Sequence, residues 1–217
     1  MKNLLRTEKG GRSVLLTRNL APGKKVYNEE LVTEGGAEYR TWDPFRSKLA
    51  AGILKGLPDD IVTEGVGVLY LGASSGTTCS HVSDIVGERG FVIGVEFAPR
   101  MAREFIENVA RMRENVIPFV ADARDPSKYS VAKVDVVYCD IAQPDQTKIA
   151  IENCRAMLKP GGALLLVVKA RSIDVLKDPA DVFRIETGKL AEAGFNVRMV
   201  VELSPFEKDH ALVLASV

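Results

Sequence analysis

From Val66 to the end of the chain, short apolar segments alternate with segments of helical length. The first apolar segment, VGVLYLG, is almost continuous, which is typical of a parallel strand covered on both faces. Four similar segments follow it: FVIGVE, NVIPFV, VDVVYC and ALLLVVK. This alternation predicts a doubly wound α/β domain whose ligand crevice lies at the carboxyl ends of the parallel strands.

Helix boundaries and the last two strands complete this prediction. We expect helices to begin near Thr77, Pro99, Pro144 and Pro179, and proline is favoured at the first helical position. The third of these helices should end at KPGG, where Gly161 can adopt the left-handed conformation of a helix end. FNVRMVVEL and HALVLASV have no helix between them, so the predicted seven-stranded sheet ends in an antiparallel pair.

Residues 1–56 follow a different pattern, and we expect them to form a small β-rich appendage that leads into a helix. Its apolar or β-branched runs are short: residues 13–17, 25–27 and 30–33. Two turn-forming pairs, PG at 22–23 and GG at 35–36, break these runs, which predicts a small antiparallel sheet. Residues 57–217 then make up the α/β domain.

The composition narrows the function classes. The 217 residues include 29 Lys and Arg against 29 Asp and Glu, which argues against a large basic surface that binds nucleic acid unaided. Residues 1–56 nevertheless carry an excess of five positive charges, and the remainder an excess of five negative ones.

Three scattered cysteines and two histidines predict neither a disulfide framework nor a metal site. Without an apolar run long enough for a signal peptide or a membrane span, we expect a cytoplasmic protein with no membrane partner.

The first predicted strand ends in GASSGTT, which starts with Gly72 and Ala73. A dinucleotide fingerprint, GxGxxG, would need glycine where Ser74 stands. A nucleophile elbow, GxSxG, does match, and Asp140 and His210 follow in the chain order of a serine hydrolase, but no strand precedes this one to complete an oxyanion hole. A loop for S-adenosylmethionine needs no second glycine, because N–H groups at a helix start can bind the methionine carboxylate. A glycine turn without function is the fourth interpretation.

Polar side chains at three successive strand ends favour the cofactor loop. Glu96 ends the second strand, where a carboxylate can accept hydrogen bonds from both ribose hydroxyls of a nucleoside. Asp122 lies just past the third strand and can bind an adenine amino group, with Phe97 against the ring. Asp140 ends the fourth strand, close to Gln143. Since the carboxyl ends of neighbouring parallel strands meet at one edge of a sheet, these residues predict an S-adenosylmethionine site.

Among the basic residues, the positions of Lys169 and His210 are informative, whereas that of Lys48 is not. Lys169 directly follows ALLLVV, so its ammonium should emerge opposite Asp140 on the neighbouring strand, as a functional pair or as a structural salt bridge. His210 begins the last strand and, taken alone, is a polar loop residue. Lys48, in WDPFRSKLAA, is by itself a solvated helix position.

From about Tyr39 to the end, the chain resembles the fibrillarins, the 2′-O-methyltransferases of box C/D guide ribonucleoproteins. The segments that carry this resemblance are RSKLAA, YLGASSGTTCSHVSDIVG, VEFAPR, ADARDP, DIAQPDQTKIAIENC, LKPGG, VVKARSIDV and PFEKDHALVL. DIAQPDQ, KARSID and EKDHA are specific to fibrillarins, whereas the glycine loop fits any class I methyltransferase. The chain is more similar to the archaeal form, which has no Gly/Arg-rich tail.

The resemblance implies a class I methyltransferase (Rossmann-like) fold, S-adenosylmethionine as the cofactor, and a set of site residues. The implied cofactor contacts come from Thr77, Thr78, Glu96, Phe97, Asp122, Ala123, Asp140, Ile141, Ala142 and Gln143. The implied catalytic group consists of Lys48, Asp140, Lys169 and His210. Within it, Lys169 is our candidate for the base or for the group that steadies a developing alkoxide.

The implied reaction is methylation of ribose 2′-hydroxyls in ribosomal or transfer RNA precursors. Its implied partners are a box C/D guide RNA and the target RNA, a coiled-coil scaffold protein and, through the scaffold, a kink-turn-binding protein. Two alternatives from other classes stay open. One is a serine hydrolase that uses Ser74, Asp140 and His210, and the other is a non-catalytic subunit of an RNA particle.

Overall fold

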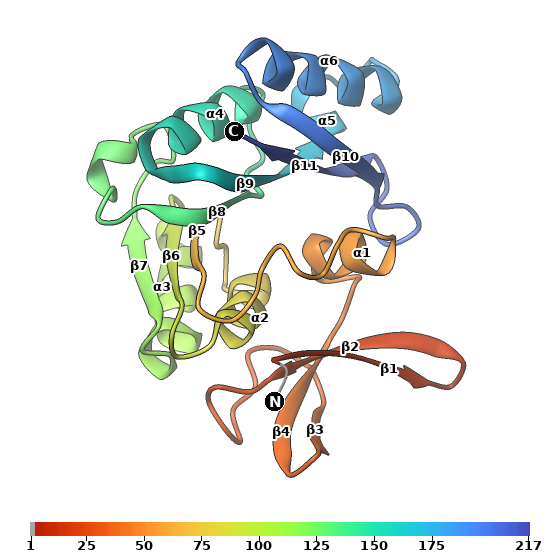
Figure 1. The fold of residues 1–217 in the computed structure, drawn as a ribbon, viewed down its shortest axis with the longest axis vertical. Helices are drawn as coiled ribbons and strands as arrows, with labels where there is room; N and C mark the ends of the chain where they lie inside the picture. Colours follow the sequence, from red (N-terminus) through yellow and green to blue (C-terminus); the bar gives the residue numbers. More distant parts are fainter. Residues whose placement is uncertain (1–2) are drawn as a thin grey trace.

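The computed structural model describes residues 3–217, which form two β-sheets and the helices that pack on them (Figure 1). The strands of the N-terminal sheet are β1 (Leu4–Lys9), β2 (Arg12–Arg18), β3 (Leu31–Glu34) and β4 (Ala37–Trp42). The strands of the second sheet are β5 (Gly67–Leu71), β6 (Phe91–Glu96), β7 (Val116–Val120), β8 (Val134–Cys139), β9 (Leu158–Lys169), β10 (Asn196–Glu202) and β11 (His210–Ser216).

Six α-helices and two short 3₁₀ helices connect these strands. The α-helices are α1 (Lys48–Leu54), α2 (Thr77–Val86), α3 (Pro99–Asn108), α4 (Gln146–Met157), α5 (Ala170–Ile173) and α6 (Pro179–Glu192). The 3₁₀ helices are η1 (Ala110–Met112) and η2 (Pro126–Lys128). Among residues 3–217, no helix is both long and apolar enough to cross a membrane.

The seven-stranded sheet has the order β10-β11-β9-β8-β5-β6-β7. Strands β9, β8, β5, β6 and β7 are parallel, and β11 runs antiparallel between β9 and β10. The chain builds outward from β5 to one side and then, from β8, to the other, so the strand order reverses between β5 and β8. The structure confirms the predicted doubly wound fold, and the reversal point is where such sheets bind ligands.

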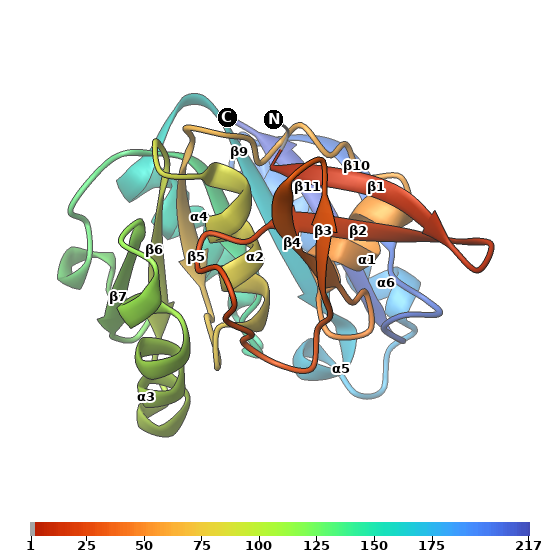
Figure 2. The same ribbon diagram turned by 90° about the horizontal axis from the view of Figure 1, so that it is seen from below.

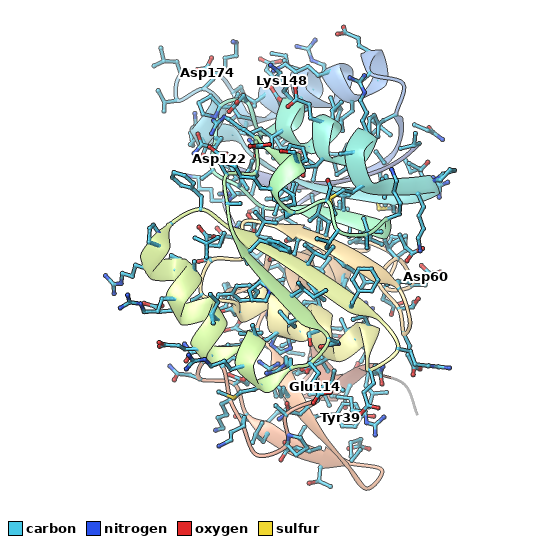
Figure 3. The ribbon with its side chains drawn as sticks, turned by 90° about the vertical axis from the view of Figure 1, so that its left-hand side faces the viewer. Tyr39, Asp60, Glu114, Asp122, Lys148 and Asp174 are labelled. Carbon is cyan, nitrogen blue, oxygen red and sulfur yellow. The ribbon has the colours of Figure 1, made fainter. Side chains whose placement is uncertain are left out.

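Two apolar cores cover the two faces of this sheet. Along β5, Val68 faces α1, α2 and α3, whereas Leu69 faces α4 and α6, as the two-residue period of a strand requires. Figure 1 shows α4, α5 and α6 on one side of the sheet, and α2 and the small sheet on the other. Figure 2, seen from below, shows the small sheet lying across α1 and α2. In Figure 3, Tyr39 marks the small sheet and Asp122 the edge at which the parallel strands end.

The N-terminal sheet has the order β1-β2-β4-β3 and is antiparallel throughout. The predicted runs at 13–17 and 30–33 fall in β2 and β3, whereas the prediction of a strand at 25–27 is wrong. There, the backbone N–H groups of Val26 and Tyr27 each donate to the Glu29 carboxylate at 2.7 Å, so a side chain replaces the sheet partner. Strands β1 and β4 were not predicted.

The boundary near KPGG also differs from the prediction. Helix α4 ends at Met157, and β9 begins at once and runs through KPGG instead of starting after it. Proline disfavours helical geometry in the residue before it, which stops the helix early. Gly161 has the predicted positive φ of 75°, but it lies inside the strand, where the pairing of β8 with β9 is irregular. Helix α5 was not predicted.

The two sheets share one apolar core. Leu15 and Trp42 of the small sheet lie in the same buried cluster as Leu49 of α1 and Val68 of β5. The predicted division of the chain after residue 56 therefore stays a prediction.

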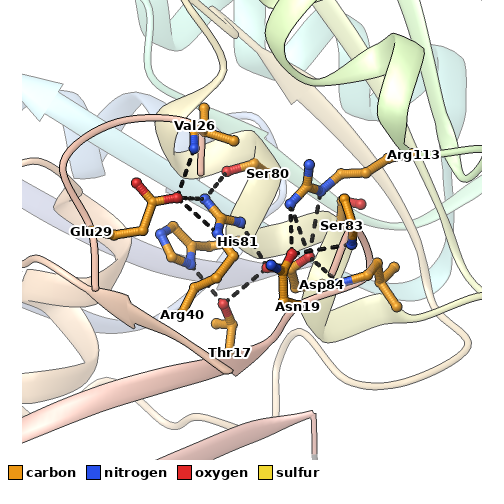
Figure 4. A network of polar contacts seen from close by, with 12 residues as sticks. Thr17, Asn19, Val26, Glu29, Arg40, Ser80, His81, Ser83, Asp84 and Arg113 are labelled. Atoms are coloured by element: carbon orange, nitrogen blue, oxygen red, sulfur yellow. Dashed lines mark hydrogen bonds and ion pairs between the residues drawn. The ribbon is translucent and has the colours of Figure 1, made fainter. Parts of the chain in front are cut away.

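A buried polar network fixes the small sheet on α2 (Figure 4). The Arg40 guanidinium on β4 donates to Asp84 Oδ2 at 2.7 Å and to Ser80 Oγ at 2.9 Å, both on α2. It also donates to Glu29 Oε1 at 2.9 Å, and Arg113 Nη2 lies 3.4 Å from Asp84 Oδ1. The charged side chains of these pairs are fully buried, and two cations balance two carboxylates. Buried ions are tolerated only when paired in this way.

His81 lies inside the same network as a neutral group. Burial lowers its pKa well below the usual 6.5, and the neighbouring Arg40 and Arg113 lower the pKa further. A ring nitrogen, Nδ1, lies 2.7 Å from Thr17 Oγ1, and the ring stacks on Trp42 with centroids 5.1 Å apart. Because the ring is neutral, it adds no third cation to the two arginines, and the two carboxylates still balance the network's charge.

Replacing Arg40 by Met should lower the free energy of unfolding by about 3–5 kcal/mol, because Glu29 and Asp84 would keep buried charges without their shared partner. Denaturant unfolding measures this change. Lys9→Met is the matched control, since its ion pair with Glu30 is exposed and should contribute little to stability. An equal, small loss in both variants would contradict a structural role for the network.

Candidate functional site

A cavity of about 370 Å³ opens where β5, β6, β7 and β8 end. Ligand pockets in proteins range from roughly 300 to 1,000 Å³, so it has room for a nucleoside-sized group. Most of the residues predicted to bind a cofactor line it: Gly72, Glu96, Phe97, Asp122, Ala123, Asp140, Ile141, Ala142 and Gln143. The strand ends therefore converge as the sequence analysis predicted.

Three residues predicted to bind the cofactor do not line this cavity. Ala73 is buried, Thr77 is half-buried, and Thr78 donates a hydrogen bond to Ser47 Oγ at 3.0 Å. Ser47 is the N-cap of α1, so the Thr78 hydroxyl joins the start of α2 to the start of α1. Their contacts with a cofactor stay predictions.

The loop after β5 comes very close to the end of β8. Gly72 has a φ of 84°, and a Cβ built there would lie 2.8 Å from the backbone oxygen of Asp140. Only glycine combines this conformation with so close an approach. At the end of the loop, Gly76, with a φ of 95°, is the N-cap of α2. The loop therefore depends on its glycines for shape, although it lacks the full dinucleotide fingerprint.

The Glu96 carboxylate is held at the cavity wall by two backbone donors. The N–H of Ser74 donates to Oε2 at 2.7 Å, and the N–H of Ala98 donates to Oε1 at 2.8 Å. Each carboxylate oxygen has a second lone pair, so Glu96 can still accept hydrogen bonds from a diol. Phe97 stands beside it with 69% of its surface exposed, which leaves a ring face free for a planar ligand.

Sequence reasoning missed Arg124, which joins two loops at the cavity. Its guanidinium contacts Asp145 Oδ1 at 2.7 Å and Asp122 Oδ2 at 3.6 Å, and it donates to Gln143 Oε1 at 3.0 Å. It lies in the ADARDP segment, but no local pattern shows that the partner is 21 residues away. The other missed lining residues are Ser74, Val95, Ala98, Ala121 and Ile149, and most are small or apolar neighbours of the predicted ones.

Two buried side chains hold the loop after β7 from behind. The Tyr129 hydroxyl lies 3.0 Å from the carbonyl oxygen of Ala123, and the Asn153 amide donates to the same oxygen at 2.8 Å. The Tyr129 hydroxyl also lies 2.7 Å from Asn153 Oδ1. Burial raises the pKa of Tyr129, so it stays protonated and can donate. Asn153 lies on α4 and Tyr129 directly follows η2, and together they fix the backbone beside Asp122.

Asp140 brings two predicted catalytic lysines together. Lys169 Nζ lies 2.8 Å from Asp140 Oδ1 and donates to the Asp140 carbonyl oxygen at 2.9 Å. Lys48 Nζ lies 3.4 Å from Oδ2 of the same carboxylate. The three side chains are only 12–19% exposed, so Lys48 is not the solvated helix position that its own segment suggests. Lys169 and Asp140 face each other across β9 and β8 as predicted.

His210 joins this group through a residue that the sequence analysis did not single out. Glu207 lies with Oε1 3.8 Å from Lys48 Nζ and with Oε2 3.9 Å from His210 Nδ1. His210 is also the direct partner of Lys169 in the pairing of β11 with β9. All four predicted catalytic residues therefore meet in one cluster, and Glu207 is its fifth member.

The serine hydrolase alternative has no geometric support. The Ser74 hydroxyl donates to the sulfur of Met101, His210 Nδ1 lies 2.7 Å from the carbonyl oxygen of Lys208, and Asp140 pairs with lysines. Within residues 3–217, no hydrogen bond joins Ser74, Asp140 and His210 to one another. A nucleophile needs its base within hydrogen-bond reach.

A family model described as Fibrillarin matches residues 1–217. The chain belongs to the fibrillarin family. A fibrillarin-like rRNA/tRNA 2′-O-methyltransferase of Sulfurisphaera tokodaii is 55% identical over 93% of this chain and 87% of its own length. The protein of the same name from Saccharolobus solfataricus is 51% identical over 99% of this chain and 94% of its own length. The family predicted from the sequence is confirmed.

Solved fibrillarin structures match the whole fold. A Methanococcus jannaschii fibrillarin, a pre-rRNA processing protein, has a TM-score of 0.92 at 42% identity and covers 100% of this chain and 98% of its own. An Aeropyrum pernix fibrillarin with natively bound S-adenosylmethionine has a TM-score of 0.87 at 43% identity, covering 99% and 100%. A fibrillarin in complex with Nop5p has a TM-score of 0.85 at 39% identity, covering 99% and 97%.

More distant structures share the fold alone. A SAM-dependent methyltransferase of Aquifex aeolicus has a TM-score of 0.56 at 19% identity and covers 81% of this chain and 89% of its own. Together with the fibrillarin matches, it confirms the predicted class I methyltransferase fold.

Gly72→Ala should destabilise this fibrillarin-family chain more than Gly161→Ala does. Both glycines have a positive φ, which costs an L-residue about 1 kcal/mol in either place. Only at Gly72 would the new Cβ also meet a backbone oxygen, because nothing lies within 4 Å of a Cβ at Gly161. Denaturant unfolding of both variants measures the difference. Equal losses would show that the loop can move away from Asp140 at no cost.

Proposed function

We propose that this protein methylates ribose 2′-hydroxyls of RNA with S-adenosylmethionine as the methyl donor. The observation that carries the proposal is the position of Asp140, which lines the cavity and whose carboxylate contacts the ammonium groups of Lys48 and Lys169. Asp140 therefore lies between the cofactor cavity and the two ammonium groups. A methyl donor bound in the cavity and an acceptor hydroxyl beside the lysines can be aligned there. Relatives named rRNA/tRNA 2′-O-methyltransferases support the same reaction.

The residues of the cavity suit S-adenosylmethionine. Glu96 offers carboxylate lone pairs to the ribose hydroxyls, and Asp122 can accept from the adenine amino group. Phe97, Ile141 and Ile149 supply apolar surface for the adenine ring. The natively bound cofactor of the Aeropyrum pernix fibrillarin supports this assignment. When bound, S-adenosylmethionine supplies a methyl group activated by its sulfonium.

Lys169 is the residue that we place beside the acceptor hydroxyl. An ammonium has three N–H donors, and Asp140 binds this one through Oδ1 and through its backbone carbonyl. Its hydrogen bond to that carbonyl leaves donor capacity for the substrate oxygen, where a charged Lys169 steadies the developing alkoxide and a neutral one accepts the proton. Lys48 and His210 complete the group, with Asp140 as the carboxylate that orients both lysines.

We also propose that the RNA is placed by partners. A chain with equal numbers of acidic and basic residues has little net attraction to phosphate, so it should hold RNA weakly alone. The structure of a similar fibrillarin with Nop5p supports a scaffold protein as one partner. The others are a box C/D guide RNA, which pairs with the target RNA, and a kink-turn-binding protein held by the scaffold. The cytoplasm is the proposed location of the reaction.

Lys169→Ala should lower kcat for methyl transfer by about 10²- to 10⁴-fold, the usual contribution of a proton-transfer group. Single-turnover methylation of a guide-matched RNA in an assembled particle measures it. Lys159→Ala is the matched control on the same strand, because Lys159 pairs with Asp135 at the surface. If the variant kept a kcat within about threefold of wild type, Lys169 would be neither the base nor the group that steadies the alkoxide, because such groups usually contribute at least about 10²-fold.

The assembled particle should methylate a guide-matched RNA, and the isolated chain should not. The assay compares methyl incorporation with the complete particle, without the scaffold protein and without the guide RNA. Full activity of the isolated chain would contradict the dependence on partners. Isothermal titration with S-adenosylmethionine distinguishes the enzyme from the remaining alternative, a non-catalytic subunit of an RNA particle. A chain that binds no cofactor would be such a subunit.

A further inference from the structure

We propose that Glu207 is a positioning residue that holds Lys48 and His210 in place within the catalytic group. The inference deepens the proposed function and rests on it. Glu207 lies in the loop between β10 and β11, which Figure 1 shows beside α1. Its two carboxylate oxygens face different partners, with Oε1 3.8 Å from Lys48 Nζ and Oε2 3.9 Å from His210 Nδ1.

Lys48 needs a second carboxylate because Asp140 is already shared. Lys169 has the closer contact with Asp140, at 2.8 Å, and a further hydrogen bond to the Asp140 carbonyl oxygen. Lys48 has only the 3.4 Å contact with Oδ2. It is also the first residue of α1, where the helix dipole disfavours a cation, and the first turn of α1 contains no acidic residue. Glu207 supplies from another element the negative charge that α1 lacks.

The contact with His210 has a defined direction. Nδ1 of His210 lies 2.7 Å from the carbonyl oxygen of Lys208, and a carbonyl can only accept, so Nδ1 carries the hydrogen. Glu207 faces this protonated nitrogen. The other ring nitrogen, Nε2, has no hydrogen-bond partner among the described residues, and in the neutral ring it is an acceptor. Glu207 and the Lys208 carbonyl therefore hold the ring with its acceptor nitrogen free.

The Glu207 side chain is not needed to hold its own loop. Phe206 packs edge-on against Phe45, with ring centroids 5.2 Å apart, and Lys55 donates to the Ser204 carbonyl oxygen at 2.8 Å. At the other end of the loop, Arg171 pairs with Asp209 at 3.0 Å. Within residues 3–217 the Glu207 carboxylate makes no hydrogen bond, and the basic side chains within 4 Å of it are Lys48 and His210. Neutralising it should therefore disturb the catalytic group and leave the fold intact.

The test is Glu207→Gln in the assembled particle, with Glu202→Gln as the matched control, because Glu202 is exposed on the neighbouring strand β10. We expect Glu207→Gln to lower the single-turnover rate about tenfold, with unchanged KM for S-adenosylmethionine and for RNA and unchanged Tm. The control should match wild type in all four measurements. In a Lys48→Met background, the effect of Glu207→Gln should fall below about threefold, because one of the two side chains that it positions is gone.

The outcomes separate this inference from the proposed function. If the wild-type particle transfers no methyl group, the proposed function fails and the inference fails with it. If wild type is active but Glu207→Gln keeps a rate within twofold of it, or loses the same factor with and without Lys48, Glu207 does not position the group. A lower Tm that accompanies the rate loss would make Glu207 a structural residue and would also overturn the inference.

Discussion

The buried pair of Arg40 and Asp84 is the interaction on which the arrangement of the two sheets depends. It joins β4 to α2 through a 2.7 Å contact between fully buried side chains, and Glu29 and Arg113 complete the charge balance. Burying any one of these ions alone would cost several kcal/mol, so all four must be in place together. The small sheet therefore has a single favourable position on α2.

That position decides where Lys48 lies. Strand β4 ends at Trp42 and α1 begins at Lys48, so only the short segment 43–47 separates the small sheet from the proposed catalytic group. Helix α1 then packs on β11, and a Cβ on Gly52 would lie only 2.6 Å from a methyl group of Leu212. None of the described residues 3–56 lines the cofactor cavity, yet Lys48 from this part of the chain is one of the two lysines at Asp140. In a chain with no net charge, this local cluster concentrates charge at the place where we propose that methyl transfer occurs, and a preorganised field there can stabilise a transition state.

Sequence reasoning worked where a property is local. The apolar runs of the large sheet could be recognised because a strand covered on both faces is apolar almost throughout. It failed at residues 25–27, whose backbone donors bind the Glu29 carboxylate, and at KPGG, where β9 takes over from α4 without a loop. It also missed β4, whose Arg40 looks like a surface residue in the sequence but is buried against α2. At residues 25–27 and at β4, partners that the local pattern does not show outweighed the local preference, whereas at KPGG the proline stops the helix early.

By itself the sequence determined the class of fold and the strand-end residues Glu96, Asp122 and Lys169, because the ends of parallel strands meet at one edge of a sheet. The family followed from segments that resemble fibrillarins, such as DIAQPDQ and KARSID. Only the tertiary structure decided which charges meet. Lys48 and Asp140 are 92 positions apart, and no periodicity or turn signal links them. Their contact arises because a small sheet is seated on one helix by buried ions, and such packing is a property of the whole folded chain.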